Sequence, residues 1–389
     1  MKIKGSKIFT CQALHDKEKR SLAILEMIRK KGLVSRTDIS RATGINVVSV
    51  SNYISSFIEK KLVLEKGHAA SSGGRKPELV ELNAKENFCV GVDMRADNIS
   101  AILVDIGMNV IAKKKVPRPE KKREVASAVV SLIEETIKSS GVLAESIRSI
   151  GIGVYCESLL PVSDEVEKKF GIGTFLGGAA SCAAYAEKRF NPDAAVEKLL
   201  YVHSDIGRST IIDGDICTGC IGDPGEMEVP ENTGRADESE PYADKLKYLN
   251  PWSPYLGMVE TAKREVARGV GTKIVSLSGG DIEKITEAVV IDAARQNDET
   301  ALNIVQGVSI NMGLRIAYLI NLFGPEAVVV GGGLEKAQDL TFPFIDKMVK
   351  RLSLKKYNNT VRIVPSLLGE EGLCLGASAF AVREVFLKA

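Results

Sequence analysis

Hydrophobic positions near the start of the chain recur first at helical spacing and then alternate with polar ones. Leu22, Leu25 and Ile28 lie on one side of a helix predicted over residues 17–31. Ser35, followed by Asp38 three residues later, is typical of a helix N-terminus and predicts a second, short helix. Alternation over residues 62–65 and 78–82 predicts two strands joined by a loop over residues 68–76.

A third helix follows the second after a very short turn. Gly44 predicts the end of the second helix, because glycine readily adopts the left-handed conformation common there. We interpret Asn46 as the cap of the third helix, with Val50, Ile54 and Phe57 as its buried stripe. Two helices so connected form a helix-turn-helix, whose second helix is presented to the major groove of DNA. The two strands complete a winged helix-turn-helix.

From residue 87 onward the pattern is that of an α/β protein in which one arrangement occurs twice. A meander of strands, three in the first half and two with a turn at residues 214–216 in the second, is followed by helices and parallel strands. This repetition predicts two similar lobes with a cleft between them. The predicted strands cover residues 88–93, 99–105, 108–116, 147–154, 199–203, 209–213, 327–330 and 361–364, and the predicted helices cover residues 120–139, 258–268, 281–296, 298–322 and 372–387.

At 389 residues the chain is long for a single core and suits one small and two larger domains. We expect a winged helix-turn-helix domain over residues 1–85, a first lobe over 86–198 and a second lobe over 199–389. The final helix is able to pack back on the first lobe.

Charge is distributed unevenly between these regions. Residues 1–85 contain 17 Lys and Arg against 8 Asp and Glu, a balance of +9, whereas the whole chain carries +2 and the remainder therefore −7. A basic module on a mildly acidic body favours a polyanionic partner such as DNA. A solvated, lysine-rich helical surface is the alternative for the charge alone.

The candidate DNA contacts lie on the third helix and in the predicted wing. Val47 begins the helix, where an apolar side chain can contact a thymine methyl, and Asn52 can hydrogen-bond to base edges or phosphates. Arg75 and Lys76 follow a flexible Ser-Ser-Gly-Gly run, which lets a cation enter a narrow minor groove. The predicted contacts are Arg36, Val47, Ser49, Ser51, Asn52, Arg75 and Lys76.

Composition favours a cytoplasmic protein without a metal or cofactor. No apolar run approaches the length of a transmembrane helix, and the first residues lack the core of a signal peptide. The seven cysteines are scattered, which favours reduced, buried thiols. Cys217 and Cys220 have the spacing of half a zinc site, but no second pair or histidine follows them.

Three stretches of the chain resemble the ROK family, which joins sugar-responsive repressors and sugar kinases. They are Ser-Gly-Gly-Arg-Lys-Pro-Glu-Leu-Val-Glu-Leu-Asn at 72–83, Asn-Leu-Phe-Gly-Pro-Glu-Ala-Val-Val-Val-Gly-Gly-Gly at 321–333, and Leu-Gly-Glu-Glu-Gly-Leu-Cys-Leu-Gly-Ala at 368–377. The resemblance spans nearly the whole chain and implies an actin-like (ribonuclease H-like), two-lobed ATPase fold. It also places the chain in the repressor branch, which alone carries the winged domain.

The chain departs from the kinases of that family at their phosphate loops. The first loop, Asp-x-Gly-x-Thr in the kinases, reads Asp-Met-Arg-Ala-Asp from Asp93, so a cation replaces the glycine that lets backbone N–H groups approach phosphates. In the second loop, only Gly207 matches. The glycines Gly331, Gly332 and Gly333 follow a predicted strand, and we favour a retained structural turn for them over a ligand loop.

The proton acceptor and the zinc histidine implied by the resemblance are also replaced. The acceptor position falls on Ala179, which has no titratable group, so general-base catalysis there is unavailable. The Gly-Glu-x-Gly-His segment aligns with residues 222–226, where Glu226 stands at the histidine position. Asp223 and Glu226 are able to bind hydroxyls of an effector, and solvated loop acids are the alternative.

These observations favour a DNA-binding transcriptional regulator, a repressor of carbohydrate-related genes, with a catalytically degenerate kinase-like body. We expect it to bind a double-stranded operator as a homodimer or higher oligomer and to respond to a sugar or sugar phosphate. Two rivals stay open: an active sugar kinase of the glucose or N-acetylglucosamine type, and a DNA-tethered scaffold that senses no small molecule.

Overall fold

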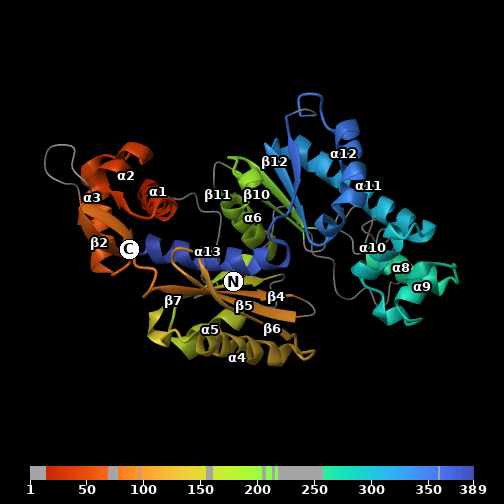
Figure 1. Cartoon of the computed structure of the whole chain (residues 1–389), viewed down its shortest axis with the longest axis horizontal. Coiled ribbons are helices and arrows are strands. Elements are labelled where there is room, and N and C mark those ends of the chain that lie inside the picture. The colour runs from red at the N-terminus through yellow and green to blue at the C-terminus, as the bar shows by residue number, and fades with distance from the viewer. Residues whose placement is uncertain are drawn as a thin grey trace, which may run out of the picture. The chain divides into compact units, whose positions relative to one another are not determined.

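The computed structural model describes residues 15–68, 78–95, 98–154, 161–203, 207–212, 215–217, 257–357 and 360–389 (Figure 1). These residues form two compact units. Unit 1 contains the described residues up to Ala186 together with those from Glu371 to Ala389, and unit 2 contains those from Glu187 to Glu370. None of the helices in these ranges has both the length and the apolar character needed to cross a bilayer.

Unit 1 begins with the predicted winged helix-turn-helix. Its helices are α1 (Asp16–Lys31), α2 (Arg36–Thr43) and α3 (Val47–Glu59), and a small sheet of order β1-β3-β2 combines β1 (Val34–Ser35), β2 (Val63–His68) and β3 (Glu78–Leu82). Ile24, Ile39, Val50, Ile54 and Phe57 are fully buried, so the stripes predicted from helical spacing form the core of this module. The three helices and the two wing strands are therefore confirmed.

Each unit contains a five-stranded sheet of the same topology. In unit 1 the order is β6-β5-β4-β7-β8, and in unit 2 it is β11-β10-β9-β12-β13. The central strand pairs with an antiparallel meander on one side and with a parallel strand on the other in both sheets. This repetition confirms the prediction of two similar lobes. The strands are β4 (Phe88–Met94), β5 (Asn98–Asp105), β6 (Val110–Pro117), β7 (Ile147–Val154), β8 (Thr174–Gly178), β9 (Leu199–His203), β10 (Gly207–Ile212), β11 (Asp215–Cys217), β12 (Ala327–Gly331) and β13 (Arg362–Pro365).

Helices cover both faces of the sheet in unit 1. Helices α4 (Lys122–Ser140) and α5 (Pro161–Phe170) pack on one face, and Val129, Ile133 and Val166 are buried there. Helix α13 (Gly372–Leu387) lies against β4 and β7 (Figure 1). The short turn η1 (Ala144–Ser146) precedes β7. Helix α6 (Ala179–Phe190) follows β8, and the short turn η3 (Pro192–Ala194) of unit 2 precedes β9.

Glycines allow α13 to approach the sheet at backbone distance. A Cβ at Gly91 or Gly151 would collide with the backbone of α13, and one at Gly376 of α13 would collide with the backbone of Cys182 in α6. Residues 372–382 of α13 are buried without a break, as expected of a helix segment enclosed by its surroundings. Its observed bounds equal the predicted range of residues 372–387.

Unit 2 surrounds its sheet with a helical layer. The elements are α8 (Met258–Ala267), α9 (Lys273–Leu277), η6 (Ile282–Lys284), α10 (Glu287–Arg295), α11 (Glu299–Phe323), η7 (Leu334–Ala337), α12 (Gln338–Leu352) and η8 (Gly369–Glu371). Val328 and Val330 of β12 pack against Ile316 and Ile320 of α11 in one buried cluster.

One predicted helix is wrong. The sequence predicts a single helix over residues 281–296, but the chain forms the short turn η6 and then α10. Thr286 separates the two because its hydroxyl accepts a hydrogen bond from the N–H of Val289 and so caps α10 as a new N-terminus. Helices α5, α9 and α12 were not predicted.

Three cysteines of unit 1 are buried free thiols, as predicted. Cys89, Cys182 and Cys374 lie in the apolar interior. Burial raises the pKa of the Cys89 thiol, because an apolar environment disfavours the thiolate. These thiols therefore act as small hydrophobic side chains.

Candidate nucleic-acid interface

The turn between α2 and α3 has the hydrogen bonds that its sequence predicts. Gly44 has φ of 70° and its N–H donates to the carbonyl of Ser40 at 2.9 Å. The side-chain oxygen of Asn46 accepts from the N–H of Ser49 at 2.8 Å, which confirms Asn46 as the cap of α3. Both ends of the turn are thus fixed, and α3 has a defined direction.

The outward face of α3 carries small and neutral side chains. Val48 is 67% exposed and Val47 43%, and Asn52 is exposed one turn after Val48. Ser49 and Ser51 are half-buried. Ser55, one turn beyond Asn52 and also exposed, was not among the predicted contacts, although its three-residue spacing from Asn52 would have indicated it. This combination suits thymine methyl contacts and hydrogen bonds to base edges.

Arg36 lies at the start of α2 and connects this helix to the two wing strands. Its guanidinium donates to Glu65 of β2 and to Glu78 of β3, each at 2.7 Å. Burial lowers the pKa of Arg36, but the hydrogen bonds and charges of the two carboxylates outweigh it, so the pKa lies above its ordinary value. Arg36 therefore fixes the base of the wing in this structure. Its contact with DNA stays a prediction, and Arg75 and Lys76 lie outside the described residues.

The side of the winged module opposite the exposed face of α3 is attached to α13 and the residues that follow it. The hydroxyl of Ser21 in α1 donates to the carbonyl of Phe386 at 2.9 Å, and the rings of Phe57 and Phe386 meet edge to face with centroids 5.1 Å apart. The hydroxyl of Ser56 in α3 donates to the backbone oxygen of Ala389 at 2.6 Å. The helix that presents its outer face to solvent is therefore held from behind by α13.

A second attachment follows the wing. The amide nitrogen of Asn87, a fully buried residue, donates to the carbonyl of Lys61 at 2.9 Å, and its amide oxygen accepts from Nε of Arg148 at 2.6 Å. Asn83 donates to the same carbonyl of Lys61 at 2.9 Å. The segment between the module and β4 is thus a hydrogen-bonded joint rather than a free linker.

The first phosphate-loop position of unit 1 is occupied by an internal ion pair. Asp93, 1% exposed at the end of β4, accepts a hydrogen bond from Nε of Arg95 at 2.9 Å. Ala179 is buried at the first position of α6, directly after β8. At this edge of the sheet, Arg95 of the same chain neutralises the carboxylate of Asp93, and the aligned acceptor position, Ala179, has no proton-accepting group.

Unit 2 brings its two glycine positions together. Gly207 of β10 and Gly331 of β12 both pair with His203 of β9, one from each side. His203 is buried and lies 6.3 Å from the ring of Tyr201. His203 was not predicted as a site residue. Its position as the last residue of a strand before the second glycine loop is the signal that could have identified it.

The three consecutive glycines meet requirements of internal packing. A Cβ at Gly331 would collide with the hydroxyl of Tyr201, and a Cβ at Gly333 would collide with the carboxylate of Glu287. Gly333 has φ of 111° and its N–H donates to the carboxylate of Glu335 at 2.7 Å. Burial raises the pKa of Glu335. The backbone donor of Gly333 is thus already used, and the carboxylates of Glu287 and Glu335 lie beside it.

A buried carboxylate in unit 2 holds the segment that precedes α13. Glu187 accepts hydrogen bonds from the hydroxyl of Ser366 at 2.5 Å, the N–H of Leu368 at 3.1 Å and the amide of Asn191 at 2.8 Å. Four such donors to one buried group, counting the N–H of Leu367 at 3.3 Å, make this a structural joint. The sequence did not indicate this role.

The predicted effector residues Asp223 and Glu226 lie outside the described residues, as do Cys217's side chain and Cys220. Within the ranges that the structure describes, no three His, Cys, Asp or Glu side chains are grouped as a metal site would need.

A profile of the ROK family matches residues 89–228 and 267–384 of the chain. The xylose repressor of Caldicellulosiruptor bescii is 25% identical over 389 residues, which cover 95% of this chain and 96% of that protein. The similarity therefore includes the winged module as well as the body.

Two solved structures have a similar fold. One is a ROK family transcriptional regulator, a homologue of the Escherichia coli MLC protein, with a TM-score of 0.74 at 21% identity, covering 95% of this chain and 96% of that one. The other is a ROK family glucokinase from Streptomyces griseus with glucose and AMPPNP, with a TM-score of 0.62 at 21% identity. The glucokinase match covers 76% of this chain and 99% of the glucokinase.

Proposed function

This chain belongs to the ROK family, and on that premise we propose that it is a sequence-specific, DNA-binding transcriptional repressor of carbohydrate-related genes. The observation that carries the proposal is the outward face of α3. Val48, Asn52 and Ser55 are exposed there, on a helix whose cap and inner side are fixed. An exposed valine at the start of such a helix has no role in the fold and suits a contact with the major groove.

The phosphate contacts would come from the basic module rather than from the body. The module has a charge balance of +9 over residues 1–85. In the body, Arg95 neutralises Asp93, and the N–H of Gly333 is occupied by Glu335.

The protein would bind its operator as a homodimer, because two recognition helices on a two-fold axis match two half-sites.

The operator sequence is unknown, so this function is tested by selecting the duplexes that the protein binds from a pool of random DNA sequences. We expect enrichment of a two-fold repeated sequence by the full chain. Asn52→Ala should lower affinity for the selected duplex by about 10- to 100-fold, since a bidentate base contact is worth about 1–3 kcal/mol. Gln296→Ala, which removes an exposed amide of unit 2, is the matched control and should have no effect. Failure to enrich any sequence contradicts the proposal.

The body would serve as the effector-binding part of the regulator. The relative from C. bescii is named a xylose repressor, and a pentose, hexose or sugar phosphate is the corresponding class of effector for this chain. A thermal-shift screen against mono- and disaccharides should show one stabilising sugar that also weakens duplex binding. Stabilisation by no sugar would favour the scaffold that senses no small molecule. A protein with this role would work in the cytoplasm.

An active sugar kinase is the second candidate, because a ROK family glucokinase is among the solved structures of similar fold. It predicts ATP-dependent phosphorylation of glucose or N-acetylglucosamine by the purified chain. Ala179 argues against it, because alanine cannot accept the proton of a sugar hydroxyl. We expect no phosphorylation above the rate measured without protein, and no zinc or other cofactor requirement for duplex binding.

A further inference from the structure

The end of α12 and the residues after it form a basic segment with two leucines between its charges. Residues 347–356 read Lys-Met-Val-Lys-Arg-Leu-Ser-Leu-Lys-Lys, with five cations and no acid. Among the described residues, the only ion pair of these cations joins Lys350 to Asp346 at 2.6 Å. All five cationic side chains are exposed. We call residues 347–356, where the chain leaves α12 (Figure 1), the α12 tip.

The α12 tip turns its leucines outwards and its serine inwards. Ser353 has extended backbone angles, with φ of −74° and ψ of 151°, so Leu352 and Leu354 point to the side opposite Ser353. Leu352 is 42% and Leu354 52% exposed. Ser353 is buried, and its hydroxyl has no hydrogen-bond partner among the described residues. Folding alone favours the reverse order, because buried hydroxyls are normally hydrogen-bonded and leucines are normally buried.

Hydrogen bonds to Asn321 of α11 hold the leucines in this arrangement. The amide nitrogen of Asn321 donates to the carbonyl of Leu352 at 3.2 Å, and its amide oxygen accepts from the N–H of Leu354 at 2.8 Å. The N–H of Ser353 between them donates to the carbonyl of Val349 at 2.8 Å. The backbone of all three residues is thus fixed, and the leucines are presented to solvent by an ordered segment.

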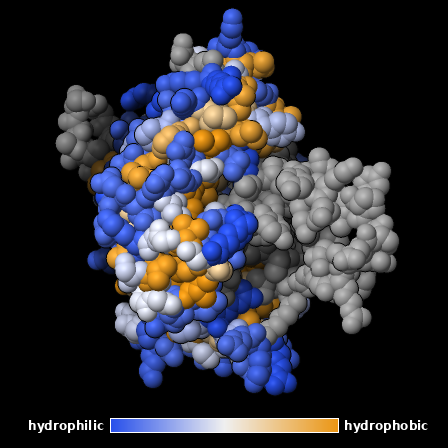
Figure 2. All heavy atoms as spheres, turned by 90° about the vertical axis from the view of Figure 1, so that its right-hand side faces the viewer, coloured by the Kyte–Doolittle hydropathy of each residue, from blue (hydrophilic) through white to orange (hydrophobic). Residues whose placement is uncertain are grey.

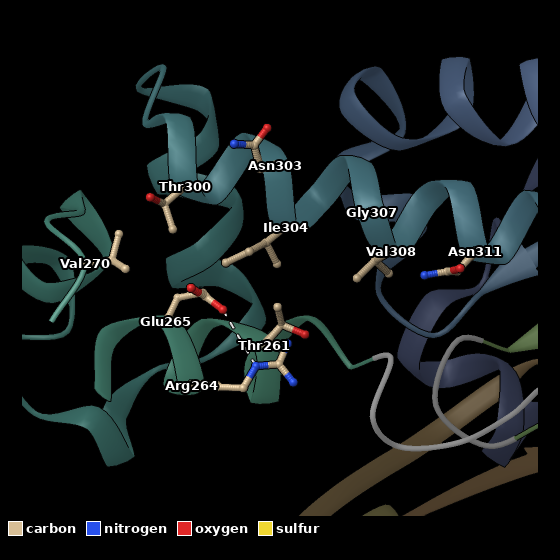
Figure 3. Close-up of a pocket in the computed structure, with 10 residues that line it drawn as sticks. All are labelled: Thr261, Arg264, Glu265, Val270, Thr300, Asn303, Ile304, Gly307, Val308 and Asn311. Atoms are coloured by element: carbon tan, nitrogen blue, oxygen red, sulfur yellow. Dashed lines mark ion pairs between the residues drawn. The ribbon is translucent and has the colours of Figure 1, made fainter. Parts of the chain in front are cut away.

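A second surface of unit 2 with exposed apolar side chains differs from the α12 tip in charge. Hydrophobic side chains reach the surface over the part of unit 2 that carries α8 to α12 (Figure 2). A groove of about 420 Å³ lies there between α8 and α11, and Ile304 and Val308 line it (Figure 3). Arg264 and Glu265 line it too and form an ion pair at 3.7 Å (Figure 3). The charges of the groove balance, whereas those of the α12 tip do not.

We propose that the α12 tip binds the surface of an anionic lipid membrane, with Leu352 and Leu354 inserted at the level of the headgroups. Exposed apolar side chains flanked by Lys and Arg are typical of segments that lie in a membrane interface. The helix dipole explains Lys350 and Arg351 in the last turn of α12, but Lys355 lies beyond that turn. An anionic surface would attract all of these cations together.

The composition of the α12 tip favours lipid over an acidic protein or DNA. Four of its five cations are lysines, whereas protein interfaces are enriched in arginine and depleted in lysine. The phosphates of a duplex would satisfy the cations but would leave both leucines in water. A membrane interface accommodates both, because long lysine side chains reach the headgroups while apolar side chains enter the acyl boundary.

Vesicle flotation of the full chain tests this binding. We expect binding to vesicles of phosphatidylglycerol and phosphatidylcholine in equal parts, and none to vesicles of phosphatidylcholine alone. Lys355→Gln should weaken binding about fivefold, the contribution of one cation near an anionic surface. Leu354→Ser should weaken it about 10-fold, because the leucine no longer leaves water. Lys284→Gln and Leu367→Ser, at exposed residues of unit 2 outside the α12 tip, are the matched controls and should bind like wild type.

Tryptophan fluorescence distinguishes insertion of the α12 tip from adsorption of the basic winged module. The emission of Leu354→Trp should shift to the blue on adding the anionic vesicles, whereas that of Leu367→Trp should not, with wild type as the background from Trp252. No vesicle binding by wild type overturns the proposal in favour of an acidic protein partner. Equal binding by all variants without the blue shift assigns the lipid contact to the winged module and overturns it too. No DNA is present, so this inference stands or falls independently of the proposed function.

Discussion

The winged module and the phosphate-loop positions of the body treat charge in opposite ways. On the outer face of α3 the side chains are exposed and uncharged, and Arg36 of α2 is held by Glu65 and Glu78 at the base of the wing. In the body, Asp93 is buried and paired with Arg95. The module leaves its recognition face open to a partner, whereas Asp93 of the first loop is already paired with a group of its own chain.

The difference teaches that a retained glycine is no sign of a retained ligand. Gly331 and Gly333 match the family pattern, yet Tyr201 and Glu287 already require glycine there. Gly307 lies outside the three stretches that resemble the family, and no described side chain explains it. The neighbours of an added Cβ therefore distinguish glycines required by internal packing from glycines that the packing of the described residues does not require.

The largest effect is expected from a substitution that disrupts the close packing of α13 against α6. Gly376→Val places two methyl groups against the backbone of Cys182, and overpacking of this kind costs about 3 kcal/mol or more. We expect a loss of that size in the free energy of unfolding, measured by urea denaturation. Gly271→Val, whose Cβ would meet nothing within 4 Å, is the control and should change stability by less than about 1 kcal/mol. Equal losses would contradict the close packing of α13.

The second change reverses the character of the α3 face. Val48→Glu places a carboxylate towards the DNA phosphates, and we expect an affinity loss of about 100-fold, measured by fluorescence anisotropy. Leu33→Glu introduces the same group at another exposed apolar residue of the module and should have a far smaller effect. Equal effects of the two substitutions would argue for general repulsion instead of a recognition face.

A smaller effect is expected at the base of the wing. Arg36→Met should lower the unfolding free energy by no more than about 1 kcal/mol, because solvent screens its two half-exposed glutamates. Arg41→Met removes a far more exposed ion pair with Asp38 and should cost nothing measurable. If Arg36→Met reduces duplex affinity while stability is unchanged, Arg36 contacts DNA directly.

The smallest effects concern two carboxylates of unit 2 with opposite pKa shifts. Burial raises the pKa of Glu335 above its ordinary 4.5. The folded protein therefore keeps this proton to a higher pH than the unfolded chain does, and its stability falls as pH rises from the ordinary pKa through the raised one. Burial also opposes ionisation of Asp298, but hydrogen bonds from Lys273, Ala301 and Thr272 outweigh it and lower its pKa. Its stabilising contribution is lost as pH falls through that lowered value.

Two substitutions separate these contributions. Glu335→Gln should gain stability relative to wild type between pH 4 and pH 7, whereas Asp298→Asn should lose stability relative to wild type at pH 7 and lose less at lower pH. Urea denaturation at several pH values measures both differences. The same sign for both variants would contradict the assignment.

Much of the fold was predictable because it depends on local pattern. The α3 stripe, the turn at Gly44 and the cap at Asn46 each involve residues within a few positions of one another. Helix α12 was not predicted because it contains Pro343. A proline removes a backbone hydrogen-bond donor, so in a sequence it usually indicates the end of a helix. Helix α9 is only five residues long, too short for a periodic signal.

The site was less predictable because its contacts join distant residues. The partners of Arg36 depend on the register of the two wing strands, which places Glu65 and Glu78 beside it. The contact of Phe57 with Phe386 joins opposite ends of the chain, and no spacing rule connects them. The exposed face of α3 could be predicted from its buried stripe, but the fixation of that helix by α13 could not.

The salt dependence of duplex binding tests the central claim most directly, namely that phosphate recognition lies in the winged module and is absent from the body. Affinity of the full chain for its selected duplex should fall steeply and linearly on logarithmic axes as salt rises, because each phosphate contact releases counterions. The same protein should show no heat of binding with MgATP at 1 mM in calorimetry. Salt-independent duplex binding, or none, together with MgATP binding would contradict the account.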